Sequence, residues 1–179
     1  MALTIEQIRA TQDNEALFDL LSGELQRLLP DTVQKNRDLY HRTIGTLPPG
    51  LRAMAGMHFF DVSMSLDSLA WHFGNQNDEC DLQETLNGLR ELEMPEIADR
   101  FEQMWDFMKP HMTALQTGEY GGKDFSDWLV DIGAEEFASE KDKFIWDYCD
   151  KIGKSGLLES WALYARKYPE RCVVAETAK

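Results

Sequence analysis

The stretch MPEIADRFEQMWDFM, residues 94–108, has the pattern of an amphipathic helix. Each residue advances an α-helix by about 100°, and this spacing gathers the acidic side chains on one side: Glu96, Asp99, Glu102 and Asp106. The large apolar side chains fall on the opposite side: Ile97, Phe101, Met104, Trp105 and Met108. The pattern predicts a helix with one face in a core and an unusually acidic outer face.

The acidic bias of this helix extends through the middle of the chain. Residues 76–150 hold 20 acidic and 6 basic side chains, whereas residues 1–75 hold 9 and 6, and residues 151–179 hold 3 and 6. Because the net charge of the whole chain is -14, the middle segment accounts for the entire excess. Such a charge argues against nucleic acid or an anionic membrane as a direct ligand, and it favours basic partners.

Helical periodicity recurs along almost the whole chain. A length of 179 residues with 43% hydrophobic and 11% aromatic side chains is enough for one domain with a substantial core. Caps, prolines and glycines mark helices after Thr4 and near residues 14–28, 31–46, 51–73, 81–92, 95–109, 124–132, 134–152 and 157–168. We predict an all-α, single-domain multi-helix bundle of about eight helices over residues 1–179, with almost no strand.

Two segments have a distinctive composition. Residues 51–73 form the most apolar part of the chain, which predicts the central, most buried element, with a kink near residues 63–68. Residues 116–123 contain Gly118, Gly121 and Gly122, which indicates a flexible loop. Gly133 and Gly153 are each expected to end a helix, with Lys154 following the second stop.

The sequence predicts a cytoplasmic protein. Its apolar runs are far shorter than the roughly 20 residues of a membrane helix, and MALTIEQIRA at the N-terminus lacks a basic segment followed by an apolar one. Cys80, Cys149 and Cys172 are odd in number and far apart, which indicates neither a disulfide framework nor a zinc knuckle. We therefore expect core or surface thiols.

Metal-dependent chemistry has only weak support. A di-iron bundle needs Glu-x-x-His pairs, whereas the chain offers Asp38-x-x-His41 and the reversed pair His58-x-x-Asp61. Such pairs arise by chance in a chain with 32 acidic residues, so we expect no metal and no cofactor. The sequence also lacks a GxSxG elbow and a phosphate-binding glycine loop. A catalytic site assembled only in space stays open as an alternative.

A second acidic face is expected on the helix near residues 134–152, with acids on one broad side and aromatic residues on the other. Trp146 falls among the acids, where it is either covered by the last helix or exposed as an interface anchor. The residues predicted to contact a partner are Glu96, Asp99, Glu102, Asp106, Asp127, Asp131, Glu135, Glu136, Glu140, Asp142 and Trp146.

The order of segments between residues 51 and 108 resembles a bacterial family named for a DNA-mimic protein. An apolar helix ends in FFDV (59–62) and is followed by LDSL (66–69), by the aromatic segment AWHFGN (70–75), and by paired helices at 86–92 and 97–107. The family's Gly-Gly turn is absent, and Glu93, Met94 and Pro95 replace its glycine-containing link. The resemblance implies a small acidic all-helical fold whose carboxylates substitute for DNA phosphates and occupy a DNA-binding protein.

These observations leave two classes of function. Our first hypothesis is an acidic protein-binding module, a DNA mimic that occupies the nucleic-acid-binding surface of a basic partner such as a transcription regulator. Neighbouring carboxylates on a helix stand about 5–6 Å apart, on the same scale as the phosphate spacing of one DNA strand, about 3.4 Å in rise. The alternative is a small metal-dependent or other enzyme in a helical bundle. A homodimer and a merely solvated acidic surface also stay open.

Overall fold

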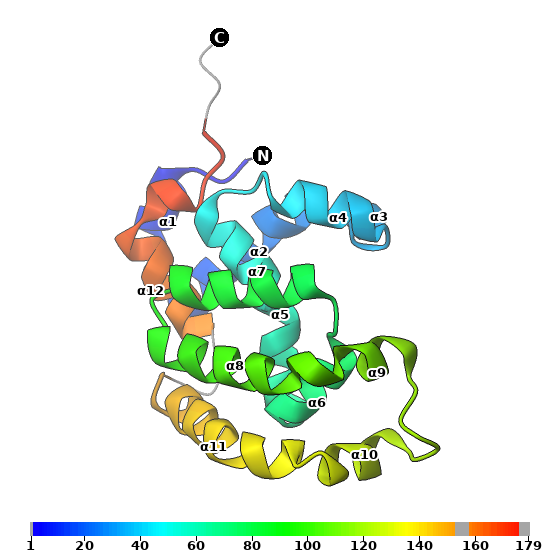
Figure 1. The fold of residues 1–179 in the computed structure, drawn as a ribbon. Coiled ribbons are helices and arrows are strands. Elements are labelled where there is room, and N and C mark those ends of the chain that lie inside the picture. The colour runs from blue at the N-terminus through cyan, green and yellow to red at the C-terminus, as the bar shows by residue number, and fades with distance from the viewer. Residues whose placement is uncertain (1, 153–157, 176–179) are drawn as a thin grey trace.

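The computed structural model describes residues 2–152 and 158–175, and within them the chain is an all-α multi-helix bundle without strands (Figure 1). Its helices are α1 (Ile5–Ala10), α2 (Asn14–Leu28), α3 (Asp31–Gln34), α4 (Arg37–Ile44), α5 (Pro49–Leu66), α6 (Leu69–Asn75), α7 (Glu79–Glu91), α8 (Pro95–Met108), α9 (Met112–Thr117), α10 (Phe125–Asp131), α11 (Ala134–Ile152) and α12 (Leu158–Lys167). Short 3₁₀ turns follow α8 (Lys109–His111) and α12 (Pro169–Arg171). The all-α prediction is confirmed.

The described part of the chain is divided into more helices than the expected eight or so. The segment 31–46 contains two helices because Asn36 lies outside the helical region of the backbone and its side chain accepts from Leu39 N. The segment 51–73 also contains two, because Asp67 is extended and the Ser68 hydroxyl accepts from Trp71 N at the start of α6. The kink expected near 63–68 is therefore a complete break between capped helices.

Helix α5 is the central element, as its composition predicts. It packs closely against α7, where a Cβ atom at Gly56 would lie 2.6 Å from Glu84 O and one at Gly88 would lie 2.6 Å from Ala53 O. The Thr85 hydroxyl donates a hydrogen bond of 2.8 Å to Gly56 O across this contact. The two glycines therefore allow the backbones of α5 and α7 to approach each other directly.

Helices α7, α8 and α11 lie side by side on one side of the bundle, with α6 behind them (Figure 1). Behind α8, the buried rings of Phe60, Phe73 and Phe101 surround His72 in an aromatic core. Helix α12 packs on α2 and α5. The acidic middle of the chain thus forms one layer on an apolar interior.

The glycine-rich loop begins later than expected. Helix α9 extends to Thr117, and Gly118 ends it in the left-handed region with φ of 69°. Gly133, with φ of 73°, separates α10 from α11 as predicted. The expected stop at Gly153 and the following Lys154 lie outside the described residues. No helix in the described ranges is both long enough and apolar enough to cross a membrane.

Candidate acidic interaction surface

Helix α8 separates its two faces as the sequence predicts. Ile97, Ala98, Phe101, Met104 and Met108 are buried, whereas Glu96, Asp99 and Asp106 are exposed. Glu102 and Trp105 lie at the edges of the helix and are partly buried. The exposed acids therefore form a ridge along α8 that points away from the core.

Two contacts attach α8 to α11. The rings of Phe107 and Phe137 stack with centroids 4.4 Å apart, and the Arg100 guanidinium lies 3.3 Å from the centre of the Phe144 ring. Aromatic stacking and cation–π contacts add to the packing of the two helices. The two acidic helices therefore have a defined position relative to each other.

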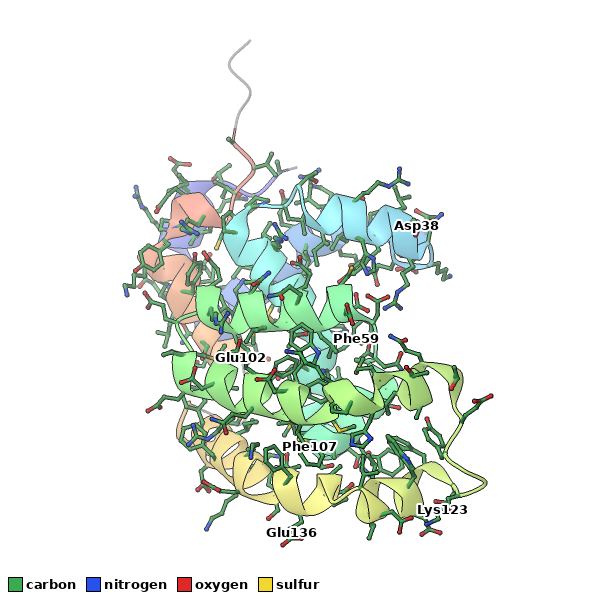
Figure 2. All side chains as sticks on the ribbon, viewed as in Figure 1. Asp38, Phe59, Glu102, Phe107, Lys123 and Glu136 are labelled. Carbon is green, nitrogen blue, oxygen red and sulfur yellow. The ribbon has the colours of Figure 1, made fainter. Side chains whose placement is uncertain are left out.

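On α11, Glu136 and Glu140 are exposed on the outer side. Glu135 is partly buried and accepts a long hydrogen bond of 3.5 Å from the Ser68 hydroxyl. Figure 2 shows Glu136 at the outer edge of α11 and Glu102 between α7 and α8. The structure therefore presents the acids as two ridges on neighbouring helices.

Some of the predicted site residues are paired with cations. Glu102 accepts from Arg90 at 2.7 Å, Asp106 pairs with Lys109, and Asp131 pairs with Lys123. Exposed pairs of this kind contribute only about 0–1 kcal/mol to stability, but they reduce the local negative charge. Within the described residues, the predicted carboxylates without an ion-pair partner are Glu96, Asp99, Asp127, Glu135, Glu136, Glu140 and Asp142.

The placement of Asp142 on the acidic surface was wrong. Its residue is only 3% exposed, and its Oδ1 accepts a 2.8 Å hydrogen bond from Leu69 N, the first residue of α6. Asp142 lies one turn from the buried residues Ala138 and Ile145, so it belongs to the inner side of α11. Its Oδ1 gives the first amide of α6 an acceptor that the helix itself does not provide.

Trp146 is partly exposed, and the helix that its indole contacts is α5 rather than the last helix. Its residue is 46% exposed, yet its indole Nε1 donates a 2.9 Å hydrogen bond to Met64 O near the end of α5. Trp146 and Asp142, one turn apart on α11, thus hold the end of α5 and the start of α6. Sequence reasoning missed this junction, although the spacing of the two residues and the capping Ser68 were the available signals.

Two buried groups in this region have shifted pKa values. Burial raises the pKa of Asp142 to about 6, against the lowering effect of the hydrogen bond from Leu69. Burial also lowers the pKa of His72 to about 3, and the ring Nδ1 of this residue lies 2.9 Å from the Ser63 hydroxyl. His72 therefore stays neutral at physiological pH, as a structural residue would.

The Asp142 carboxyl should give the protein a characteristic pH dependence. Because its pKa is higher in the folded chain than the ordinary value of about 3.9, the folded state binds more protons, and the contribution of Asp142 to stability is lost as pH rises from about 4 to about 6. The free energy of unfolding of wild type relative to Asp142→Asn should fall by on the order of 2 kcal/mol over this interval. Urea unfolding at several pH values measures this difference.

Because His72 is present in both wild type and Asp142→Asn, the difference between them cancels its opposite effect on the pH dependence of stability. Its contribution is lost as pH falls from about 6.5 towards 3, but this loss occurs in both proteins. A constant difference between wild type and Asp142→Asn from pH 4 to pH 7 would contradict the raised pKa of Asp142.

The sequence-derived metal ligands do not come together. Asp38 and His58 are exposed on α4 and α5, and neither they nor Asp61 enter the group of adjacent ligands found among the described residues. His41 points its Nε2 at Asp81 Oδ1, 2.8 Å away on α7. Of the predicted set, His41 belongs to a group of three adjacent side chains that can bind a metal, together with Asp78 and Cys80. Of the cysteines, Cys80 is exposed and Cys172 is buried.

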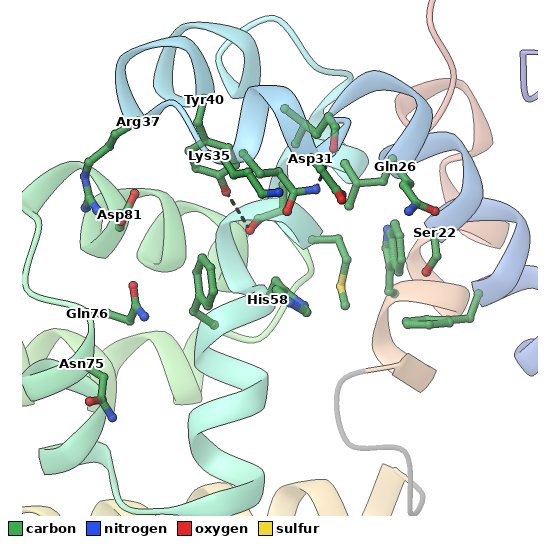
Figure 3. A pocket seen from close by; sticks show the side chains of 18 residues that line it. Ser22, Gln26, Asp31, Lys35, Arg37, Tyr40, His58, Asn75, Gln76 and Asp81 are labelled. Carbon is green, nitrogen blue, oxygen red and sulfur yellow. Dashed lines mark hydrogen bonds and ion pairs between the residues drawn. The ribbon is translucent and has the colours of Figure 1, made fainter.

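A groove of about 850 Å³ lies alongside the middle of α5 (Figure 3). Its lining residues come from α2, α3, α4, α5, α6, α7 and α12, and its apolar lining includes Phe18, Met54 and Phe59. Figure 3 shows Arg37 and Asp81 at one end and Ser22 and Gln26 at the other. The α5 residues that line the groove lie in the middle of that helix, whereas α11 contacts its C-terminal end. The groove is therefore separate from the contact between α5 and α11. Sequence reasoning missed it because its walls come from distant parts of the chain.

Comparison with protein families gave one match. A family model described as DMP19-like protein matches residues 45–167, more than half of the chain. The matched region includes α5 to α12 and therefore both acidic ridges, and it extends well beyond the segment 51–108 that carries the sequence resemblance. No curated protein and no solved structure matched the chain.

Proposed function

We propose that this chain, which belongs to the DMP19-like protein family, binds a basic DNA-binding protein through the acidic ridges of α8 and α11 and competes with DNA for that partner. The family is named for DNA mimicry, and this chain carries its excess negative charge in the region matched by the family model. The observation that carries the proposal is the exposed ridge of α8, where Glu96 and Asp99 form no ion pair with any of the described residues.

The dimensions of the ridge suit this role. At a rise of about 1.5 Å per residue, the row from Glu96 to Asp106 spans about 15 Å. This length corresponds to about four phosphate steps of one DNA strand, at about 3.4 Å each. Glu136 and Glu140 on the adjacent α11 supply a second row of charge. A cationic surface shaped for a duplex would meet carboxylates at similar intervals.

The rigidity of the two helices also supports the proposal. Phe107 and Arg100 attach α8 to Phe137 and Phe144 of α11, so the charged rows are positioned before a partner arrives. Preorganised groups lose less conformational freedom on binding than mobile ones. The half-exposed Trp146 is a candidate anchor, since its hydrogen bond to Met64 restrains the indole while part of the residue stays accessible.

The set of proposed contact residues is smaller than the sequence alone implied. Asp142 is excluded because its carboxyl is buried against α6. The unpaired and exposed acids are Glu96, Asp99, Asp127, Glu136 and Glu140. Glu102, Asp106 and Asp131 can bind the partner after each releases the arginine or lysine with which it is paired. Glu135 is partly buried and lies at the edge of the acidic surface. Association should be fast at low salt and should weaken as salt screens the charges.

A capture experiment followed by a competition assay tests the function. Proteins retained by the wild-type chain from a lysate of the source cells are identified, and each is purified and tested for DNA binding. The affinity of the chain for a captured DNA-binding protein is then measured at low and high salt, with and without the DNA that this protein binds. Binding that responds to neither salt nor DNA would exclude the acidic surface as the site.

Charge reversal on α8 provides the specific prediction. Glu96→Lys combined with Asp99→Lys should weaken binding by about 10- to 100-fold, because two attractive charges become repulsive against a basic surface. The matched control is Glu15→Lys with Asp19→Lys on the exposed side of α2, which changes the net charge equally. A similar loss in both double variants would show that total charge, rather than the α8 ridge, determines affinity. Melting temperatures verify that both variants are folded.

A further inference from the structure

Three side chains with different metal-binding atoms meet where α4 approaches the N-terminus of α7. One nitrogen of His41, one carboxylate oxygen of Asp78 and the sulfur of Cys80 all lie within 4.8 Å of one another. His41 belongs to α4, Asp78 is the N-cap of α7, and Cys80 is in its first turn. The tertiary structure therefore brings together donors that are far apart in the sequence.

We propose that His41, Asp78 and Cys80 form a binding site for a divalent cation of the zinc class. Imidazole, carboxylate and thiolate are the ligands that Zn²⁺ takes in proteins, at about 2.0–2.3 Å from the metal. Tetrahedral bonds of this length place ligand atoms roughly 3.3–3.8 Å apart, so closure requires shifts on the order of 1 Å. Cys80 is exposed and the other two are partly exposed, which leaves room for such shifts.

The binding step is chemically simple. The Cys80 thiol releases its proton to solvent, and the resulting thiolate forms the bond to the cation together with His41 and Asp78. Three protein ligands leave the fourth position for solvent. Asp81 acts as the positioning carboxylate, since its Oδ1 lies 2.8 Å from His41 Nε2. In this arrangement Nδ1 is the ring nitrogen that binds the cation, and Asp81 orients the ring from the other side, as carboxylates do behind metal-bound histidines.

Arg37 is the competitor of the metal at this site. Its guanidinium donates to Asp78 Oδ2 at 3.1 Å and to Asp81 Oδ2 at 2.6 Å. These bonds neutralise the carboxylates in the metal-free chain, so a cation has to displace Arg37 from Asp78. The Arg37 side chain is 56% exposed and can move into solvent. Removal of this competing charge should therefore increase metal affinity.

The site would also connect two helices that line the large groove, α4 and α7. Arg37 and Asp81 lie at one end of the large groove (Figure 3). A cation shared by His41 of α4 and the first turn of α7 would hold that end of the groove in place. It would therefore link metal binding to the shape of the groove.

Titration of the chelator-treated full chain with Zn²⁺, followed by calorimetry, tests the proposal, and Co²⁺ provides a spectroscopic probe of the sulfur ligand. We expect about one equivalent of metal to bind and a thiolate-to-cobalt absorption band to appear. Cys80→Ser should abolish the band and weaken Zn²⁺ binding by at least about 10-fold. Arg37→Gln should tighten binding several-fold, an effect that mere loss of stability cannot produce.

His58→Ala is the matched control, because His58 is an exposed histidine outside the cluster, and it should leave binding unchanged. Absence of Zn²⁺ binding in both wild type and Arg37→Gln would overturn the proposal. Binding that persists unchanged in Cys80→Ser and His41→Ala would also overturn it, since the metal would then be held by other surface groups. Circular dichroism verifies that each variant is folded.

Discussion

Replacement of Phe60 by alanine is expected to lower the free energy of unfolding by about 3–5 kcal/mol, the usual cost of removing a fully buried ring. Phe60 is 0% exposed, and its ring meets His72 and Phe101 edge to face, with centroids 5.5 and 5.6 Å apart. The cavity would lie at the centre of the core, between α5, α6 and α8. Urea unfolding monitored by far-ultraviolet circular dichroism measures the loss.

Phe59, the adjacent residue, is the matched control. It is 45% exposed on the groove side of α5, so Phe59→Ala should cost less than about 1 kcal/mol. The same chemical change at neighbouring positions isolates burial as the cause, provided that the denaturant slope stays constant. An equal loss of unfolding free energy in Phe59→Ala and Phe60→Ala would contradict an α5 that turns Phe60 to the core and Phe59 to the groove.

Replacement of Gly56 by alanine should lower the free energy of unfolding by about 2–3 kcal/mol, near the upper end for overpacking. The added methyl group would lie 2.6 Å from Glu84 O and 2.8 Å from Glu84 C, both backbone atoms that cannot rotate away. Helices α5 and α7 would have to separate, and the hydrogen bond from Thr85 to Gly56 O would lengthen. Thermal and urea unfolding both report this effect.

Gly23 provides a control of opposite sign. It lies within α2, and a Cβ atom there would have nothing within 4 Å. Gly23→Ala should therefore raise the free energy of unfolding by about 0.5–1 kcal/mol, because alanine loses less backbone entropy than glycine in a helix. If both glycines responded in the same direction, helix propensity rather than the α5–α7 contact would control the outcome.

The candidate surface shows which side-chain positions the local sequence pattern predicts correctly and which it does not. On α8, periodicity placed Ile97, Phe101 and Met104 in the core and Glu96 and Asp99 outside, and the structure agrees. On α11 the same reasoning failed for Asp142, because that helix is covered by α6 as well as by α8. A helical wheel gives the angle of a side chain, but it does not give the number of neighbours that the helix has.

The sequence by itself determined the all-α class, the helix ends at caps and glycines, and the concentration of charge in the middle of the chain. These properties follow from interactions within a few residues, such as the capping bond from Gln7 N to the Thr4 hydroxyl or the positive φ of Gly133. Only the tertiary structure decided that α5 and α7 meet at glycines, that Trp146 and Asp142 hold the α5–α6 junction, and that His41 lies beside Cys80. Each of these contacts joins residues 28 or more positions apart in the chain. Which residues meet depends on how whole helices pack, and local periodicity does not encode that packing.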